Sequence, residues 1–341
     1  MTKWSRSLTV GATLVLAAAL ALSGCSKKTE SGGAGGNGAQ VKIAFVPKIQ
    51  GIPYFEAMNT GGKKAAQELG VQWIYNGPTT ADPAAQTSIV RSLIQQRVSA
   101  IVVAPNDPDS IAPVLAEAQS KGIKVLTSDT DAPNSVREAF VNQASPKGIG
   151  EVVVDTLLTK MGGKGKFAIV SCGQTAANLN SWIDVEKPYA ASKYPNAQLI
   201  DVVYAGEDQN AAVAMSKDLM NAHPDLTGLV GQCTTSATGV AQAVTEAGKI
   251  GTVQTVGVGT PQSMKGYLAS GASAGSVLWD VENLGYLTAW AATQSVKGTP
   301  LAETNRVSEA LPAVKYDAAQ KTLLLGEPLV LTPANVDKFS Y

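Results

Sequence analysis

The chain has 341 residues, and its 27 lysines and arginines balance its 27 aspartates and glutamates. This length predicts about two domains of ordinary size, and the lack of net positive charge argues against a nucleic-acid partner. One histidine, His223, and three cysteines leave little room for His-based catalytic triads or Cys/His zinc sites, whereas carboxylate chemistry stays open.

The N-terminus has the layout of a secretory signal peptide, with a basic start, an apolar run from Leu8 to Leu22 and small residues after it. The run is short for a membrane-spanning helix. The segment Leu22-Ser23-Gly24-Cys25 resembles a bacterial lipobox, in which the cysteine is acylated; the alternative is an ordinary signal peptide with a chance cysteine. We predict a lipoprotein signal peptide at residues 1–24, lipid attachment at Cys25 and a flexible Gly-rich tether at 25–40.

From residue 41 onward, short β-branched runs alternate with amphipathic segments. The expected strands are Lys42–Val46, Gln72–Asn76, Ala100–Ala104, Lys124–Thr127, Ala139–Asn142, Lys166–Ser171, Gln198–Tyr204, Gly228–Gly231, Thr252–Gly257 and Ala274–Leu278. The expected helices lie near 55–69, 83–97, 109–121, 146–161, 181–193, 208–221, 237–248, 261–270 and 281–297. The pattern predicts an α/β fold with two doubly wound parallel sheets of about five strands each.

The two sheets imply two domains that share the chain discontinuously. We assign residues 41–144 and 280–305 to an N-terminal α/β domain, and residues 145–279 and 306–341 to a C-terminal α/β domain. The tail loses the strand–helix alternation and offers only short strands, near Ala313–Tyr316, Thr322–Leu325 and Leu329–Leu331.

Ligands of wound sheets bind outside the carboxyl ends of the strands, so the polar residues that follow each strand are the candidate site. Lys48 and Asp129 follow first-domain strands, and Gln232, Thr234 and Trp279 follow second-domain strands. Such groups offer paired donors and acceptors to hydroxyls, and Trp279, Tyr54 and Phe55 provide faces that stack on the C–H groups of a sugar or polyol.

The chain resembles the ribose-type periplasmic solute-binding proteins of ABC importers, over about residues 41–341. The segments that carry the resemblance are Ile43–Lys48, Ala100–Ala104, Lys124–Asp131, Val256–Pro261 and Leu278–Val281, together with the lipobox. The resemblance implies a type I periplasmic binding protein with a multi-crossing hinge, an ABC permease as partner, a monomer, no cofactor, no metal and no catalysis.

Within that family, the Pro-Lys pair and the Asp-x-Asp motif suggest the branch of the autoinducer-2 receptor and the rhamnose-type binding proteins. The receptor's lysine and first aspartate match Lys48 and Asp129. Its remaining pocket residues, Asp, Gln, Pro and Ala, fall on Asn178, Leu179, Gln232 and Thr234. These replacements favour another small polyhydroxylated ligand over the furanosyl signal.

Several candidates have structural alternatives. Asp129 could accept two ligand hydroxyls or organise a turn, and Asp131 could act within the turn that ends at Asn134. Asn178 could cap a helix, and Trp182 is expected in the core. Cys172 and Cys233 follow strands that a 2-1-3 order makes neighbours, so they are either a disulfide or two buried thiols.

The sequence therefore predicts an extracytoplasmic lipoprotein, anchored to the cell membrane or periplasmic, that binds a sugar or polyol of about four to six carbons. Alternatives are an autoinducer-2-type receptor and an extracytoplasmic carboxylate glycosidase; the latter is disfavoured because Asp129 and Asp131 share one loop. The predicted ligand-binding residues are Lys48, Tyr54, Phe55, Asp129, Asp131, Asn178, Gln232, Thr234 and Trp279.

Overall fold

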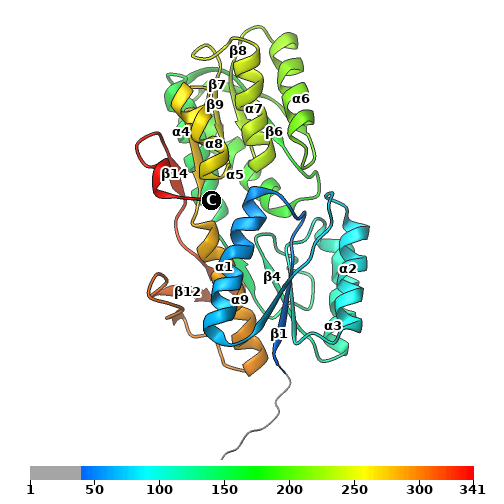
Figure 1. Cartoon of the computed structure of the whole chain (residues 1–341). Coiled ribbons are helices and arrows are strands. Elements are labelled where there is room, and N and C mark those ends of the chain that lie inside the picture. Colours follow the sequence, from blue (N-terminus) through cyan, green and yellow to red (C-terminus); the bar gives the residue numbers. More distant parts are fainter. Residues whose placement is uncertain (1–39) are drawn as a thin grey trace, which may run out of the picture. The chain divides into compact units, whose positions relative to one another are not determined.

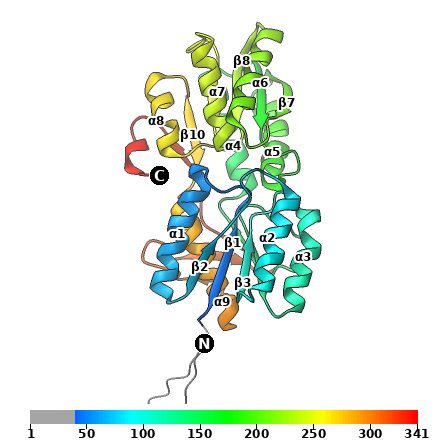
Figure 2. The same ribbon diagram turned by 45° about the vertical axis from the view of Figure 1, so that its right-hand side comes forward.

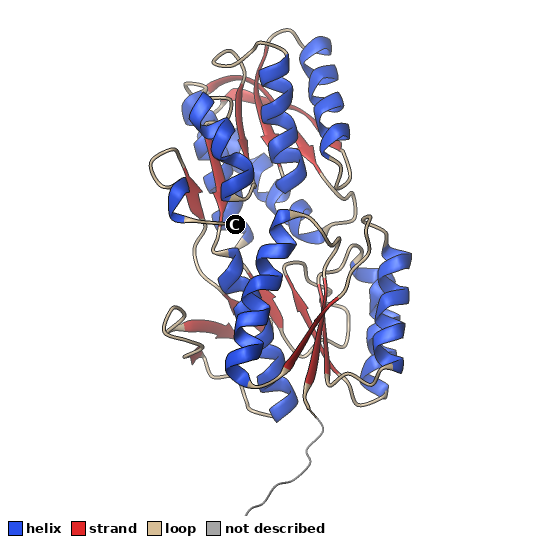
Figure 3. Ribbon diagram, viewed as in Figure 1, coloured by secondary structure: helices blue, strands red, loops and turns tan. Residues whose placement is uncertain are grey.

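Parallel strands alternate with helices along most of the chain, as the hydrophobic pattern predicts (Figure 3). The structure is a computed structural model that describes residues 40–341. The predicted signal peptide, the lipid site at Cys25 and nearly all of the tether lie outside those residues. None of the helices within the described range is long and apolar enough to cross a membrane.

The described residues form two lobes, each built on one sheet (Figure 1). The first sheet has the strand order β11-β12-β13-β5-β4-β3-β1-β2. Its strands are β1 (Lys42–Val46), β2 (Gln72–Tyr75), β3 (Ala100–Val103), β4 (Lys124–Ser128), β5 (Phe140–Asn142), β11 (Thr304–Asn305), β12 (Val314–Asp317) and β13 (Thr322–Leu324). Its helices are α1 (Pro53–Leu69), α2 (Pro83–Gln95), α3 (Pro108–Ser120) and α9 (Val281–Lys297).

The second sheet has the order β14-β10-β9-β8-β6-β7. Its strands are β6 (Lys164–Ser171), β7 (Asn196–Tyr204), β8 (Leu226–Gly231), β9 (Gln254–Gly257), β10 (Gly275–Leu278) and β14 (Leu329–Leu331). Its helices are α4 (Pro146–Lys160), α5 (Ala177–Lys193), α6 (Gln209–Ala222), α7 (Thr234–Glu246), α8 (Pro261–Ser270) and the 3₁₀ turn η1 (Val336–Lys338).

The central strands are buried on both faces because helices cover each side of the sheet. In the first lobe, α2 and α3 lie on one side and α1 and α9 on the other (Figure 2). All four residues of β3 are buried, which explains its unbroken apolar run. Residues at the N-termini of the helices favour helix initiation. Asp82 and Asp107 cap α2 and α3 through their carboxylates, and a proline follows each of them at the first helical position. The predicted α/β fold with two wound sheets is confirmed.

The tail differs from the predicted domain assignment. We placed residues 306–341 in the second domain, but β12 and β13 join the first sheet, where β13 pairs in parallel with β5. Only the end of the tail follows the prediction, since β14 pairs with β10 of the second sheet. The tail strands also explain why the sheets have eight and six strands in place of about five each. The chain passes between the lobes after β5, after β10 and after β13, which is the multi-crossing connection that the resemblance implies.

Helices α1 and α9 pack against each other with almost no side chain between them. A Cβ atom at Gly61 would overlap the carbonyl group of Glu282, and one at Gly285 would overlap the carbonyl group of Met58. Tyr54 lies in the first turn of α1, and Trp279 lies just before α9. The close helix contact therefore sets the separation of two aromatic residues that belong to the candidate site.

Candidate functional site

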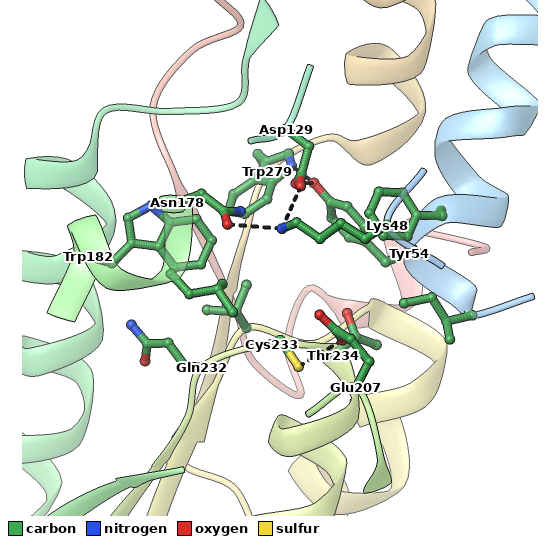
Figure 4. Close-up of a pocket in the computed structure, with 14 residues that line it drawn as sticks. Lys48, Tyr54, Asp129, Asn178, Trp182, Glu207, Gln232, Cys233, Thr234 and Trp279 are labelled. Carbon is green, nitrogen blue, oxygen red and sulfur yellow. Dashed lines mark hydrogen bonds and ion pairs between the residues drawn. The ribbon is translucent and has the colours of Figure 1, made fainter. Parts of the chain in front are cut away.

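A cavity of about 40 Å³ lies where the carboxyl ends of strands from both sheets meet. This volume suffices for a few water molecules, so a sugar-sized ligand requires the lining side chains or the lobes to move apart. Its walls come from both lobes (Figure 4). The lining residues are Lys48, Ile52, Tyr54, Phe55, Asp129, Asn178, Leu179, Trp182, Glu207, Gln232, Cys233, Thr234, Val258 and Trp279. Every predicted ligand-binding residue except Asp131 is among them.

An ion pair forms the polar centre of the cavity. The Lys48 Nζ atom lies 3.1 Å from Asp129 Oδ2, and both side chains are about 95% buried, with 5% and 4% of their surface exposed. The same ammonium group donates to Asn178 Oδ1 at 2.9 Å, which joins the first lobe to the second (Figure 4). An ammonium group has three donors, so one N–H of Lys48 stays available to a ligand.

Asp129 is held from several sides. Tyr54 donates its hydroxyl to Asp129 Oδ1 at 2.8 Å, and Thr130 donates to Oδ2 at 3.0 Å. A carboxylate accepts about four hydrogen bonds, and Lys48 provides a third, so about one acceptor position remains. The expectation that Asp129 binds two ligand hydroxyls therefore requires the release of a protein donor. Together, Lys48 and Asp129 offer one donor and one acceptor, which suits a hydroxyl group or a vicinal pair.

The backbone of Asp129 has an unusual conformation, with φ of 66°. This left-handed region is uncommon for residues other than glycine, and Asp and Asn tolerate it best. The conformation lets β4 end and the chain turn while the carboxylate points at Lys48. Backbone strain of this kind tends to occur at functional sites, where the surrounding structure maintains it.

Aromatic rings form the apolar wall of the cavity. Trp279 makes edge-to-face contacts with Tyr54, at 5.9 Å between centroids, and with Trp182, at 5.8 Å. The indole N–H of Trp279 donates to the Tyr54 hydroxyl at 3.2 Å. Burial, followed by the nearby Asp129 charge, raises the pKa of Tyr54 well above its usual value, so Tyr54 remains a neutral donor. Trp182, expected in the core, is buried and also lines the cavity.

Asp131 does not line the cavity. Its carboxylate accepts from Arg137 Nη2 and from Thr127 Oγ1, each at 2.7 Å, and from the backbone N–H of Ala132 at 2.8 Å. The Asp-x-Asp motif thus divides its two carboxylates between the cavity and a structural ion pair. The predicted ligand role of Asp131 does not fit this geometry, because these partners hold its side chain away from the site.

Sequence reasoning missed Glu207, whose side chain lines the cavity from the second lobe. Glu207 follows β7 after the two-residue segment Ala205-Gly206. The rule that found Lys48 and Asp129 also applies here, since Glu207 lies beyond the carboxyl end of a parallel strand. The signal was therefore present, but the residues after this strand were not among the candidates.

Cys172 and Cys233 form a disulfide, which resolves the alternatives that the sequence left open. They follow β6 and β8, which pair in parallel as the 2-1-3 order required, and their Cα atoms are 6.2 Å apart. Their sulfurs and a Glu207 carboxylate oxygen all lie within 4.8 Å of one another. Sulfurs bonded to each other are not thiolates, so this cluster is not a metal site in the disulfide state.

A buried carboxyl group stands behind Gln232. The Gln232 Nε2 atom donates to Glu186 Oε1 at 2.6 Å, and both residues are almost fully buried. Desolvation raises the pKa of Glu186 to about 8, so this group holds its proton at neutral pH. Gln232 Oε1 has no hydrogen-bond partner within the described structure. The hydrogen bond to Glu186 thus fixes the Gln232 amide and leaves its oxygen, Oε1, as an acceptor beside the cavity.

Two wound lobes with a cavity between their strand ends define the class of two-domain α/β binding proteins. Residues 43–300 match the family described as periplasmic binding protein domain, and the chain belongs to this family. A xylitol-binding protein of Mycolicibacterium smegmatis is 31% identical over 211 residues, which cover 60% of this chain and 56% of the relative. The ribose import binding protein of Bacillus subtilis is 26% identical over 214 residues, covering 63% of this chain and 68% of the relative.

Two solved structures support the branch suggested by the Pro-Lys and Asp-x-Asp motifs. LsrB from Clostridium saccharobutylicum in complex with AI-2 has a TM-score of 0.82 at 26% identity, and the match covers 88% of this chain and 100% of that one. An ABC transporter solute-binding protein from Clostridium phytofermentas with bound L-rhamnose has a TM-score of 0.83 at 29% identity, covering 88% and 98%. The resemblance to ribose-type solute-binding proteins is confirmed.

Proposed function

We propose that this chain is an extracytoplasmic solute-binding lipoprotein of an ABC importer that captures a small sugar or polyol between its lobes. The observation that carries the proposal is the buried Lys48–Asp129 pair beside the aromatic wall of Tyr54, Trp182 and Trp279. A polyol needs alternating donors and acceptors for its hydroxyls and flat apolar faces for its C–H groups. Relatives with sugar ligands support this ligand class, among them a protein with bound L-rhamnose.

Capture would proceed by closure of the lobes around the ligand. Side-chain hydrogen bonds span the lobes in the structure, among them Lys48 to Asn178, Thr175 Oγ1 to the carbonyl of Asn106 at 3.0 Å, and Trp279 Nε1 to the Tyr54 hydroxyl at 3.2 Å. Lys48 belongs to the first lobe and Asn178 to the second. A ligand that contacts both residues would therefore stabilise the closed state. The closed monomer would then dock on a membrane permease, which needs both lobes in a fixed relation.

Two other functions remain as alternatives. A receptor for an autoinducer-2-type signal is supported by the likeness to LsrB and by the matching Lys48 and Asp129. A glycosidase would need an acid and a free base or nucleophile. Asp129 and Glu207 both line the cavity, but Asp129 is bound by Lys48, Tyr54 and Thr130 and is poorly placed as a nucleophile.

Neutral hydroxyl-rich ligands are expected to raise the melting temperature. A panel of D-ribose, D-arabinose, L-rhamnose and xylitol, with amino acids as the comparison set, tests the ligand class. At a hundredfold excess over Kd the gain is about 2.7 kcal/mol, a readily measured shift. The ligand recovered by chromatography should be unchanged, since a binding protein does not turn it over. Stabilisation by an amino acid and by no member of the panel would contradict the proposal.

Cys25→Ala is expected to release the protein from the membrane fraction, because acylation of Cys25 is the proposed anchor. Cell fractionation followed by immunodetection measures the distribution of the full-length chain. Cys172→Ala is a control that changes a cysteine outside the lipobox and should leave the folded protein on membranes. Full membrane retention of the Cys25 variant would show that the lipobox interpretation is wrong.

A further inference from the structure

Glu207 brings a second carboxyl group into the cavity, opposite the Lys48–Asp129 pair. It extends from the segment between β7 and α6 and lies beside Thr234 and Cys233 (Figure 4). Lys48 and Asp129 belong to the other lobe and lie across the cavity. A ligand held between the lobes would therefore meet Asp129 on one side and Glu207 on the other.

The partners of Glu207 compensate a negative charge only in part. No ion pair within 4.0 Å joins Glu207 to a basic side chain in the described part of the chain, and Lys48 is already paired with Asp129. The Sγ atom of Cys233 lies 3.4 Å from Glu207 Oε2. Because this sulfur is in the disulfide with Cys172, it carries no proton to donate. The Thr235 side chain contributes a hydrogen bond to the carboxyl group.

The charges in the cavity balance only when Glu207 is neutral. Lys48 contributes one positive charge and Asp129 one negative charge, so an ionised Glu207 would be an uncompensated anion on the half-buried cavity wall. Desolvation raises the pKa of Glu207 from 4.5 to about 7; Lys48 lowers it, Asp129 raises it and the Thr235 hydrogen bond lowers it. The charge balance and the raised pKa therefore favour the same neutral form of Glu207.

We propose that Glu207 is a ligand-binding residue that acts as a neutral carboxylic acid and donates its O–H to an oxygen of an uncharged sugar or polyol. The proposal rests on the proposed function and adds a donor to its site. A neutral carboxylic acid has both a donor and acceptor capacity, as a hydroxyl has, so it pairs with a hydroxyl in either direction.

This assignment couples ligand capture to proton uptake. In an open, hydrated cleft, Glu207 loses its proton near the ordinary value of 4.5, whereas the closed site keeps it up to about 7. Between these two values the closed liganded form binds one more proton than the open form. Affinity is therefore highest at acid pH, falls as the pH rises through this interval, and levels off above it. A cationic ligand such as an amino sugar would show the opposite trend, because it would favour ionised Glu207.

Isothermal titration calorimetry of the mature protein between pH 5 and 7.5 tests the proposal, with the best binder among D-ribose, D-arabinose, L-rhamnose and xylitol as the probe. The wild-type protein should bind about tenfold or more tighter at pH 5 than at pH 7.5. Repeating the titrations in buffers of different ionisation enthalpy should reveal uptake of up to about one proton. Glu207→Gln should remove both effects, and Glu207→Ala provides a second non-titrating variant if the first does not fold.

Two further variants separate Glu207 from other carboxyls. Glu246→Gln alters an exposed glutamate at the far end of α7 and should retain the wild-type pH profile. Glu186→Gln removes the buried carboxyl behind Gln232, which titrates at a higher pH, and should leave the fall between pH 5 and 7 in place. A pH-independent wild-type affinity, or a Glu207→Gln variant with the wild-type slope, would overturn the proposal.

Failure of the proposed function would look different. If no member of the panel binds at pH 5 or at pH 7.5, the sugar proposal fails, and ¹³C NMR of labelled glutamate carboxyls in the mature protein decides the state of Glu207. A resonance that titrates near 7 and disappears in Glu207→Gln supports a proton-holding carboxyl in the cavity. Titration near 4.5 overturns it.

Discussion

Asp129→Asn is expected to weaken sugar binding by about 2 kcal/mol or more, which corresponds to about 30-fold or more in Kd. The substitution keeps the side-chain shape and suits the left-handed backbone at this position, where φ is 66°. It removes the charge that Lys48 faces at 3.1 Å and weakens the acceptor offered to a ligand hydroxyl. Alanine would be a poorer test, because it also disfavours the left-handed backbone and leaves the Tyr54 hydroxyl without its acceptor.

Asp131→Asn is the matched control for this prediction. Asp131 lies two residues further along the same loop, but its carboxylate pairs with Arg137, which is 8% exposed. Loss of that pair should lower the melting temperature and leave affinity per folded molecule unchanged. Melting curves and calorimetric titrations of both variants separate the two roles. Wild-type affinity in folded Asp129→Asn would remove Asp129 from the site.

Most of the cavity wall was predictable because parallel strands bring their carboxyl ends to one edge of a sheet. Lys48, Asp129, Gln232 and Trp279 follow four different strands and still share one cavity. Their sequence separation carries no information about this, whereas the strand–helix alternation does. Glu207 obeys the same rule, since it lies beyond the carboxyl end of β7 and lines the same cavity.

The direction of a side chain was not predictable in the same way. Asp129 and Asp131 have the same chemistry and lie on one loop, and only the first faces the cavity. The difference depends on the left-handed turn at Asp129 and on Arg137, whose position is set by the fold. The Asp-x-Asp motif therefore identifies the loop, but it does not tell which of its two aspartates faces the cavity and which pairs with Arg137.

The tail was misassigned for a different reason. A parallel strand is tied to its sheet by the helix before it, but β12 and β13 follow no helix and are only four and three residues long. Strand β12 pairs antiparallel with β13, and β13 extends the first sheet at β5. Edge additions of this kind depend on which sheet leaves an open edge nearby, and the hydrophobic pattern of three or four residues does not encode that choice.

Gly285→Ala is expected to destabilise the protein by about 3 kcal/mol. A methyl group at this position would overlap the backbone of Met58 in α1, and backbone cannot move aside by changing a rotamer. Helices α1 and α9 must then separate, which also draws Tyr54 away from Trp279, the ring pair at 5.9 Å that forms the aromatic wall. We therefore expect weaker ligand binding in the molecules that still fold.

Gly266→Ala is the control, because Gly266 lies within α8 and a Cβ there would have no atom within 4 Å. That substitution should stabilise the protein by about 0.5–1 kcal/mol through helix propensity. Denaturant unfolding of both variants, followed by calorimetry, measures the two effects. If the two alanine variants have equal free energies of unfolding, the α1–α9 contact accommodates a methyl group without loss of stability. If Gly285→Ala binds the ligand with unchanged affinity, the α1–α9 contact does not position the aromatic wall.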